Sequence, residues 1–188
     1  MKTAVLIDGS NFYHRLKKCC IQRSSFFDYR RFLNFLLQID DSLEYVGYYV
    51  GLVQKKSGEL KSERLYAAQQ SLFYNLRVFL PAIRVVYGHI QNTHGIFQEK
   101  GVDVRLALDV YRLAREQEFK KIILLSSDAD LLPAVELAQQ VGCVVEYVGL
   151  HNHLSQALLR NCRRKRILFC SDLKPFEQPP HVNSHVDS

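Results

Sequence analysis

The amino-acid sequence predicts an α/β domain built on a doubly wound, mostly parallel sheet of about five strands with helices on both faces. Short apolar runs alternate with segments of helical periodicity along the chain, which is typical of repeated strand–helix units. The 188 residues are 47% hydrophobic, which is enough for one domain with a core, and only 9 are glycine and 5 proline. The expected strand order is 3-2-1-4-5.

The individual elements follow from these patterns. Strands are expected where apolar residues run together, at residues 4–7, 45–52, 83–89, 121–126 and 144–148. Helices are expected between and after them, at residues 12–20, 29–39, 61–76, 104–116, 131–141 and 154–162. The helix at 104–116 repeats its apolar residues close to every 3.6 positions. Gly142 directly follows the helix expected at 131–141 and is suited to end it. A short strand at 167–170 would complete the domain.

One domain is expected over residues 1–170, followed by a flexible tail at 171–188 that contains Pro179 and Pro180 and has little to bury. No apolar run approaches the roughly 18 residues of a membrane span. The apolar run at the N-terminus meets Asp8 before a secretory signal develops. These features predict a protein without a membrane anchor.

The cysteines favour a reducing compartment. There are 5 of them, an odd number, and none forms a C-x-x-C pair. We interpret them as reduced thiols, which argues against a structural zinc site. They do not distinguish the cytoplasm from the nucleus, and the expected location is the cytoplasm.

The positive charge is concentrated near the C-terminus. The net charge is +6, from 25 basic and 19 acidic residues. Within one short segment the basic residues are Arg160, Arg163, Arg164, Lys165 and Arg166. Such a density suits the phosphates of a nucleic acid. The alternative is a solvated helix end with favourable dipole interactions.

Acidic residues follow two of the expected strands. Asp8 ends the first apolar run, and Asp128 and Asp130 follow the run at 121–126. In the order 3-2-1-4-5 these strands are neighbours, and their carboxyl ends border the point where such sheets bind ligands. Asp103 begins the helix that leads from the third strand to the fourth, so it starts at the same edge. We therefore expect the four carboxylates to converge.

Converging carboxylates predict a metal site. They repel one another unless they are protonated or bound to cations. Hard oxygen ligands without a Cys/His set favour Mg²⁺ or Mn²⁺ over Zn²⁺. Asn11 adds a neutral oxygen ligand or holds a water. Each acid also has a local alternative: Asp103 and Asp130 as helix caps, Asp8 as the acceptor of a turn, and Asp128 in a loop hydrogen bond.

Other polar residues are interpreted as structural. Asp109 lies six positions after Asp103, about 240° around the same helix, and so faces away from the expected site. His151 and His153 lie in a polar loop, where two histidines without a third ligand are a weak metal signal.

Three runs resemble the motifs of a known family. VLIDGSNF at residues 5–12, EKGVDV at 99–104 and LLSSDADLLP at 124–133 are similar to the three motifs of NYN domains, the LabA-like branch of the PIN-like nuclease superfamily. The resemblance covers the chain to about residue 159. It implies a PIN-like α/β fold and a Mg²⁺- or Mn²⁺-dependent ribonuclease. Its acidic site would consist of Asp8, Asp103, Asp128 and Asp130, with Asn11 beside them. The sequence departs from the family pattern at Ser127, where glycine is usual.

The predicted activity is hydrolysis of RNA phosphodiester bonds by a metal-activated water. The partner would be RNA, single-stranded or structured and non-coding, with the segment 160–166 binding backbone phosphates and exposed aromatic residues stacking on unpaired bases. The sequence leaves open whether two chains pair. The main alternative is an RNA-binding adaptor of the same fold with little turnover. A HAD-type phosphatase would need an acid where Ser10 stands, and a dinucleotide enzyme would need the missing G-x-G-x-x-G.

Overall fold

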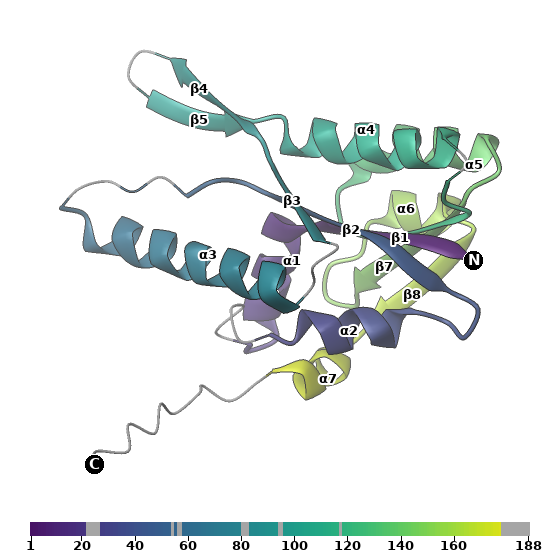
Figure 1. The fold of residues 1–188 in the computed structure, drawn as a ribbon, viewed down its shortest axis with the longest axis horizontal. Coiled ribbons are helices and arrows are strands. Elements are labelled where there is room, and N and C mark those ends of the chain that lie inside the picture. Colours follow the sequence, from purple (N-terminus) through teal and green to yellow (C-terminus); the bar gives the residue numbers. More distant parts are fainter. Residues whose placement is uncertain are drawn as a thin grey trace.

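The fold is described from a computed structural model that covers residues 1–21, 27–53, 55, 58–79, 83–93, 96–116 and 118–177. Its centre is a parallel sheet of six strands in the order β3-β2-β1-β6-β7-β8 (Figure 1). The strands are β1 (Lys2–Asp8), β2 (Ser42–Val50), β3 (Ile83–Tyr87), β6 (Lys121–Leu125), β7 (Val144–Leu150) and β8 (Arg164–Leu168). The order confirms the predicted fold class, with β8 as an additional edge strand.

Helices cover both faces of this sheet. The longer ones are α1 (Gly9–Lys18), α2 (Tyr29–Leu36), α3 (Leu60–Phe79), α4 (Val102–Arg115) and α5 (Leu132–Gln140). Shorter ones are α6 (Gln156–Asn161), α7 (Cys170–Leu173) and the 3₁₀ turns η2 (Ala129–Leu131) and η3 (Lys174–Phe176). Gly142 has a φ of 92° directly after α5, a left-handed conformation that costs glycine little, which confirms the predicted helix end.

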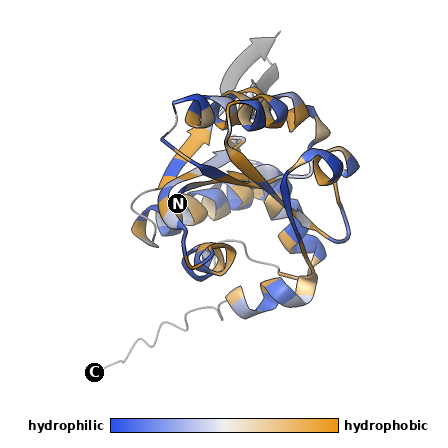
Figure 2. Ribbon diagram, turned by 90° about the vertical axis from the view of Figure 1, so that its right-hand side faces the viewer, coloured by the Kyte–Doolittle hydropathy of each residue, from blue (hydrophilic) through white to orange (hydrophobic). Residues whose placement is uncertain are grey.

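Alternating strand residues supply two separate cores. Val5 and Ile7 of β1 belong to the core beneath α1, α2, α3 and α7. Ala4 and Leu6 belong to the other core, beneath α4, α5 and α6. Because both faces are covered, the central strands are apolar along nearly their whole length. Figure 2 shows the resulting hydrophobic colouring along the sheet between the two helical layers.

The strand expected at residues 83–89 is two strands in the structure. β3 ends at Tyr87, and an antiparallel pair, β4 (His89–Thr93) and β5 (Ile96–Lys100), comes before α4. The sequence prediction missed this pair because its two five-residue strands are rich in polar residues and lack clear alternation. The strand expected at 167–170 begins earlier, at Arg164.

The C-terminal boundary expected at residue 170 was placed too early. Residues 170–176 form α7 and η3, where Leu173 is fully buried and Phe176 is 7% exposed. Phe176 contacts the rings of Phe27 and Phe32 and so closes one end of the core beneath α2. The remainder of the expected tail, residues 178–188, lies outside the described residues.

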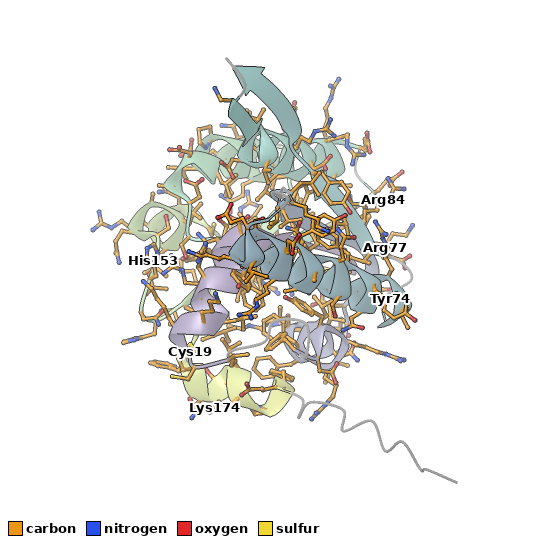
Figure 3. All side chains as sticks on the ribbon, turned by 90° about the vertical axis from the view of Figure 1, so that its left-hand side faces the viewer. Cys19, Tyr74, Arg77, Arg84, His153 and Lys174 are labelled. Atoms are coloured by element: carbon orange, nitrogen blue, oxygen red, sulfur yellow. A yellow bond between two sulfur atoms is a disulfide. The ribbon has the colours of Figure 1, made fainter. Side chains whose placement is uncertain are left out.

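The interpretation of all five cysteines as reduced thiols was wrong. Cys19 and Cys170 form a disulfide across a separation of 151 residues, with their Cα atoms 5.1 Å apart (Figure 3). The bridge joins the end of α1 to the start of α7, two segments that only the folded chain brings together. The cysteine argument for a cytoplasmic location therefore loses its basis.

Removing this disulfide should lower the stability of the protein. Loss of a native disulfide typically costs about 2–5 kcal/mol, which for a chain of this size corresponds to a fall in Tm on the order of 10 °C. We expect this fall for Cys19→Ser, measured by thermal unfolding, while Cys20→Ser, a change at an exposed free thiol, leaves Tm nearly unchanged. Five titratable thiols in the unreduced, denatured protein, in place of three, would show that the bridge does not form.

Candidate active site

The deepest carboxylate of the candidate site belongs to Asp8, the last residue of β1. Asp8 is 6% exposed and also caps α1, because its Oδ1 accepts from the backbone N–H of Asn11 at 2.9 Å. Its Oδ2 accepts from the hydroxyl of Ser126, which follows β6, at 2.9 Å. One oxygen is thus fixed by the first turn of α1 and the other by the residue that follows β6. Asp8, for which a turn acceptor was the local alternative, is the N-cap of α1.

Close packing behind Asp8 fixes where α1 begins. Gly9 lies against the fully buried ring of Tyr48, and a Cβ atom at Gly9 would stand 2.3 Å from Tyr48 Cε1. Real Cβ atoms do not come this close, so a side chain here would push α1 away from β2. Glycine therefore allows α1 to start directly after Asp8.

The turn after β6 carries two more carboxylates. Asp128 caps η2, since its Oδ1 accepts from the backbone N–H of Asp130 at 2.9 Å. Its own N–H donates to Ser126 Oγ at 3.1 Å. Asp130 is exposed and lies in the first turn of η2, so the capping role considered for it belongs to Asp128. Ser127 fixes the same turn by donating to the carbonyl of His153 at 2.8 Å.

Asp103 lies on the exposed rim in the first turn of α4. Gly101 occupies the capping position and offers no side-chain oxygen, so no side chain caps α4. The capping alternative for Asp103 is therefore not realised, and its carboxylate is available to the site.

The charges of these acids influence one another. Burial raises the pKa of Asp8, the hydrogen bonds from Asn11 and Ser126 lower it, and the charges of Asp103 and Asp128 raise it. Burial also raises the pKa of Asp103, with further contributions from Asp128 and Asp130. The four acids therefore form one electrostatically coupled group, in which Asp8 is buried and Asp103 and Asp130 are exposed. This arrangement places the four predicted acids around one region.

The four carboxylates do not form a closed set of metal ligands in the described part of the chain. Among the residues that the structure describes, no three Asp, Glu, His or Cys side chains are arranged to hold a metal ion. The chemistry of the donors nevertheless fits a hard dication, because all four are carboxylates whose mutual repulsion positive charge would relieve. The residues therefore fit a divalent cation by the type of their donor atoms and by their negative charge.

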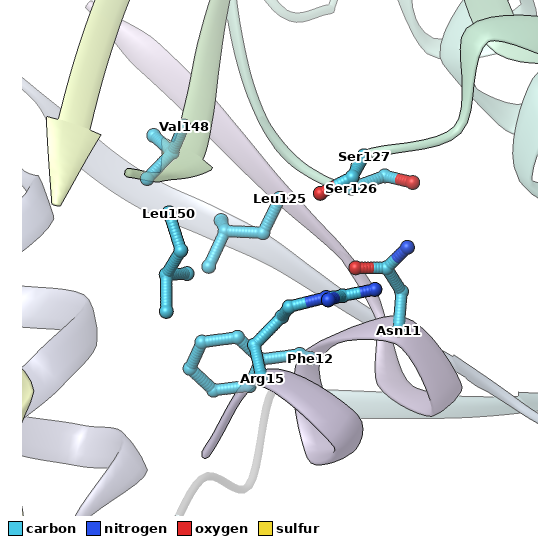
Figure 4. Close-up of a pocket in the computed structure, with 8 residues that line it drawn as sticks. All are labelled: Asn11, Phe12, Arg15, Leu125, Ser126, Ser127, Val148 and Leu150. Carbon is cyan, nitrogen blue, oxygen red and sulfur yellow. The ribbon is translucent and has the colours of Figure 1, made fainter. Parts of the chain in front are cut away.

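Sequence reasoning missed Arg15, which lies one turn after Asn11 in α1. A small cavity of about 10 Å³, room for about one water-sized atom, borders this turn of the helix. Its lining residues are Asn11, Phe12, Arg15, Leu125, Ser126, Ser127, Val148 and Leu150. Figure 4 shows the Arg15 guanidinium extending toward Asn11 and the two serines. The four-residue spacing from Asn11 was a signal that could have identified it.

The basic segment begins in the last turn of α6 with Arg160, continues through the turn with Arg163, and ends on β8 with Arg164, Lys165 and Arg166. The side chain of Arg164 donates to Gln38, and that of Arg166 donates to the carbonyl of Phe35. Arg166 also forms an ion pair with Glu146 at 2.8 Å. None of the five basic residues lines the described cavity beside Asn11. The structure thus gives Arg164 and Arg166 scaffold contacts that sequence density did not predict.

A second cavity, of about 230 Å³, lies at the ends of β7 and β8. Its lining includes Leu150, which also lines the smaller cavity, together with His151 and Phe169. The rings of His151 and Phe169 are stacked with centroids 4.7 Å apart, and Phe169 is 49% exposed. An aromatic surface therefore lies next to the small cavity beside Asn11.

Asp109 has the structural contacts expected of it. Its Oδ2 accepts from the hydroxyl of Tyr49 at 2.7 Å, and its Oδ1 pairs with Arg112 at 2.9 Å. These contacts connect α4 with β2 and with its own next turn. Asp109 is thus engaged within the fold.

Comparison with known proteins gives the family. The model of the NYN domain matches residues 2–168, nearly the whole chain. The chain belongs to the NYN domain family. NYN domains are PIN-like nucleases, which places the protein in a nuclease-type, RNA-related class and agrees with the three motifs.

Individual relatives are more distant. A segment of 58 residues is 38% identical to the uncharacterized protein y4oD of Sinorhizobium fredii (strain NBRC 101917 / NGR234) and covers 31% of this chain and 27% of that protein. The crystal structure of VPA0982, a protein of unknown function from Vibrio parahaemolyticus RIMD 2210633, has a TM-score of 0.59 at 22% identity and covers 89% of this NYN domain and 92% of its own chain. The latter similarity supports the fold.

The helices of this NYN domain do not resemble membrane spans. Within the described ranges, no helix combines the length and apolar character needed to cross a bilayer.

Proposed function

We propose that this NYN domain is a metal-dependent ribonuclease that hydrolyses RNA phosphodiester bonds. The observation that carries the proposal is the group of four acids around one sheet edge, with the pKa of Asp8 and of Asp103 raised by burial and by neighbouring negative charge. Uncompensated negative charge at a topological switch point is suited to a cation and to the phosphate that the cation attracts. The family supports a nuclease of this kind.

Asp8, Asp103, Asp128 and Asp130 would hold Mg²⁺ or Mn²⁺, with Asn11 beside them. When bound, a divalent cation supplies Lewis-acid activation of water and neutralises charge on the scissile phosphate. The chain contributes orientation: Asn11 N–H and Ser126 Oγ hold the two oxygens of Asp8, and the N–H of Asp130 holds Asp128. These fixed acceptors lower the cost of ordering the site when substrate binds.

The proposal is tested by incubating labelled single-stranded RNA with the purified protein in Mn²⁺, in Mg²⁺ and in EDTA. We expect cleavage that requires the dication and that Asp128→Asn reduces by about 10²–10³-fold or more. Glu136→Gln, a charge-neutralising change at an exposed position on α5, should cleave normally. RNA binding by the wild type without dication-dependent cleavage would support the adaptor function instead.

We further propose that the exposed ring of Phe169, stacked on His151, supports an unpaired base of the bound RNA. Stacking of one base on an aromatic ring contributes about 1–3 kcal/mol. In an Asp128→Asn background, which prevents cleavage, Phe169→Ala should weaken binding of single-stranded RNA by roughly 5- to 100-fold.

A matched change is available on α3, where Tyr74 is 69% exposed (Figure 3). In the same background Tyr74→Ala should leave affinity unchanged when measured by fluorescence anisotropy. Equal losses for the two variants would argue that Phe169 has no specific role in binding a base.

The predicted phosphate contacts of Arg160, Arg163, Arg164, Lys165 and Arg166 belong to the same proposal. Arg163 donates to the carbonyl of Gln139, and Lys165 is exposed on β8. Since these residues lie outside the small cavity, their role would be to bind backbone phosphates remote from the scissile bond.

A further inference from the structure

Arg15 contributes a positive charge beside the acidic pocket, and the described part of the chain leaves most of its hydrogen-bonding capacity unused. Its Nε and Nη1 are buried and have no hydrogen-bond partner there. The guanidinium lines the small cavity together with Asn11, Ser126 and Ser127 (Figure 4).

Asp8 does not satisfy this guanidinium. Its charge acts on Arg15, but its two oxygens accept from Asn11 N–H and Ser126 Oγ. Within the described ranges the two side chains form no ion pair at 4.0 Å or less. Arg15 thus lies within electrostatic reach of Asp8 without pairing with it, and it shares its cavity with Ser126, the hydrogen-bond partner of Asp8.

An unpaired guanidinium in this position is unfavourable. Buried N–H groups that lose water without gaining an acceptor reduce stability, and the cost is larger for a charged group. Burial lowers the pKa of Arg15, while the charge of Asp8 opposes this effect. A structural arginine would normally be paired with a carboxylate or a carbonyl. No such partner is present among the described residues, which favours an acceptor supplied by a bound ligand.

We propose that Arg15 donates hydrogen bonds to a non-bridging oxygen of the RNA phosphate bound at the carboxylate pocket. The inference rests on the proposed ribonuclease function and names a substrate-binding residue for it. The cavity of about 10 Å³ has room for a single oxygen atom and excludes a base or a ribose. Guanidinium is the side-chain group best suited to phosphate oxygens, because it is planar and permanently charged.

The position in the fold explains how Arg15 would act. Asp8, Asn11 and Arg15 follow one another from the cap to the second turn of α1. The same helix therefore carries a negatively charged carboxylate at its cap and a positively charged guanidinium in its second turn. The carboxylates would attract the cation. Arg15 would supply positive charge to the phosphate, which the carboxylates cannot do.

The test compares Arg15→Met and Arg15→Lys with Lys18→Met, which removes an exposed positive charge from the same helix. We expect Arg15→Met to reduce Mn²⁺-dependent RNA cleavage by about 10²–10³-fold, and Arg15→Lys to restore only part of it. Lys18→Met should cleave at the wild-type rate. The Tm of Arg15→Met should equal or exceed that of the wild type, because an unpaired buried charge is removed.

A binding measurement separates this inference from the proposed function. In the Asp128→Asn background, Arg15→Met should weaken RNA binding and reduce the slope of log K against log salt by about 1. If the wild type cleaves RNA but Arg15→Met cleaves equally well, the role of Arg15 is overturned and the ribonuclease stands. If the wild type cleaves nothing, the ribonuclease fails. An unchanged salt slope, or a fall in Tm that accounts for the lost activity, would also overturn the role of Arg15.

Discussion

Asp8→Asn is expected to abolish RNA cleavage and at the same time to raise the Tm of the metal-free protein. Cleavage should fall by at least about 10²–10³-fold, because the most deeply buried of the four proposed carboxylate ligands becomes a neutral amide. The fold loses little, since an asparagine oxygen still accepts from Asn11 N–H and its NH₂ group can donate to Ser126 Oγ.

The gain in stability follows from the direction of the pKa shift. Asp8 has a raised pKa in the folded protein, so the ionised carboxylate lowers stability at pH values above that pKa. This cost disappears as the pH falls through the folded pKa toward the unfolded value. We therefore expect Asp8→Asn to raise Tm in EDTA at pH 7.5 by a few degrees, about 0.5–2 kcal/mol, and to show a smaller difference at pH 4.

If the carboxylates bind Mn²⁺, the added cation should reverse the order of the two Tm values, so that the wild type becomes more stable than Asp8→Asn. The dication should raise the Tm of the wild type and of Glu136→Gln, because ligands that bind only the folded state stabilise it. It should have little effect on Asp8→Asn. A lower Tm for Asp8→Asn in EDTA at pH 7.5 would contradict the proposed repulsion within the pocket.

Lys121→Met is expected to destabilise the fold strongly. Lys121 is the first residue of the central strand β6, at the end of the sheet opposite to Asp8. The side chain of Lys121 is fully buried in β6 and forms ion pairs with Asp41 at 2.6 Å and with Glu146 at 2.8 Å. Arg166 of β8 pairs with Glu146 and extends the network. Removing one partner of a buried pair leaves an uncompensated charge and costs about 3–5 kcal/mol, so Tm should fall on the order of 10 °C.

The pH dependence of this loss distinguishes charge from packing. The pKa of Asp41 is lowered; although burial raises it, hydrogen bonds and charge from Lys121 and a hydrogen bond from the backbone of Gln38 outweigh that effect. Its contribution to stability is therefore present above its unfolded pKa and is lost as the pH falls through the folded pKa. Without Lys121 the buried acid takes up a proton more readily, so the Tm difference between variant and wild type should narrow from pH 7 to pH 4.

The neighbouring exposed residue provides the control, since Lys120→Met should change Tm by only a small amount. A pH-independent loss for Lys121→Met would indicate that packing, and not the buried charges, determines the effect. The result also bears on Arg166, because its partner Glu146 depends on the same network.

Local sequence patterns were sufficient for the central sheet and for the positions of two acids after its strands. Strands buried on both faces produce nearly continuous apolar runs, so β1, β6 and β7 could be located from residue type alone. Asp8 and Asp128 follow two of these runs, and because β1 and β6 are parallel neighbours their carboxyl ends lie at the same edge of the sheet. The three motifs added the family, which the match over residues 2–168 confirms.

Other features depend on contacts between residues distant in the chain. Cys19 and Cys170 gave no spacing signal, because their pairing requires α1 and α7 to meet. The basic segment looked like a uniform phosphate-binding run, but contacts with Gln38, Phe35 and Glu146 assign Arg164 and Arg166 to the scaffold as well.

The sequence by itself determined the architecture and the positions of Asp8 and Asp128 after two neighbouring strands, because hydrophobic periodicity can be read from local stretches of the chain. Only the tertiary structure decided that Asp8 is the buried acid, that Asp103 and Asp130 form an exposed rim, and that Arg15 lacks a partner in the described chain. The physical reason is that burial, desolvation and hydrogen-bond satisfaction depend on all the neighbours of an atom, and most of those neighbours come from other parts of the chain.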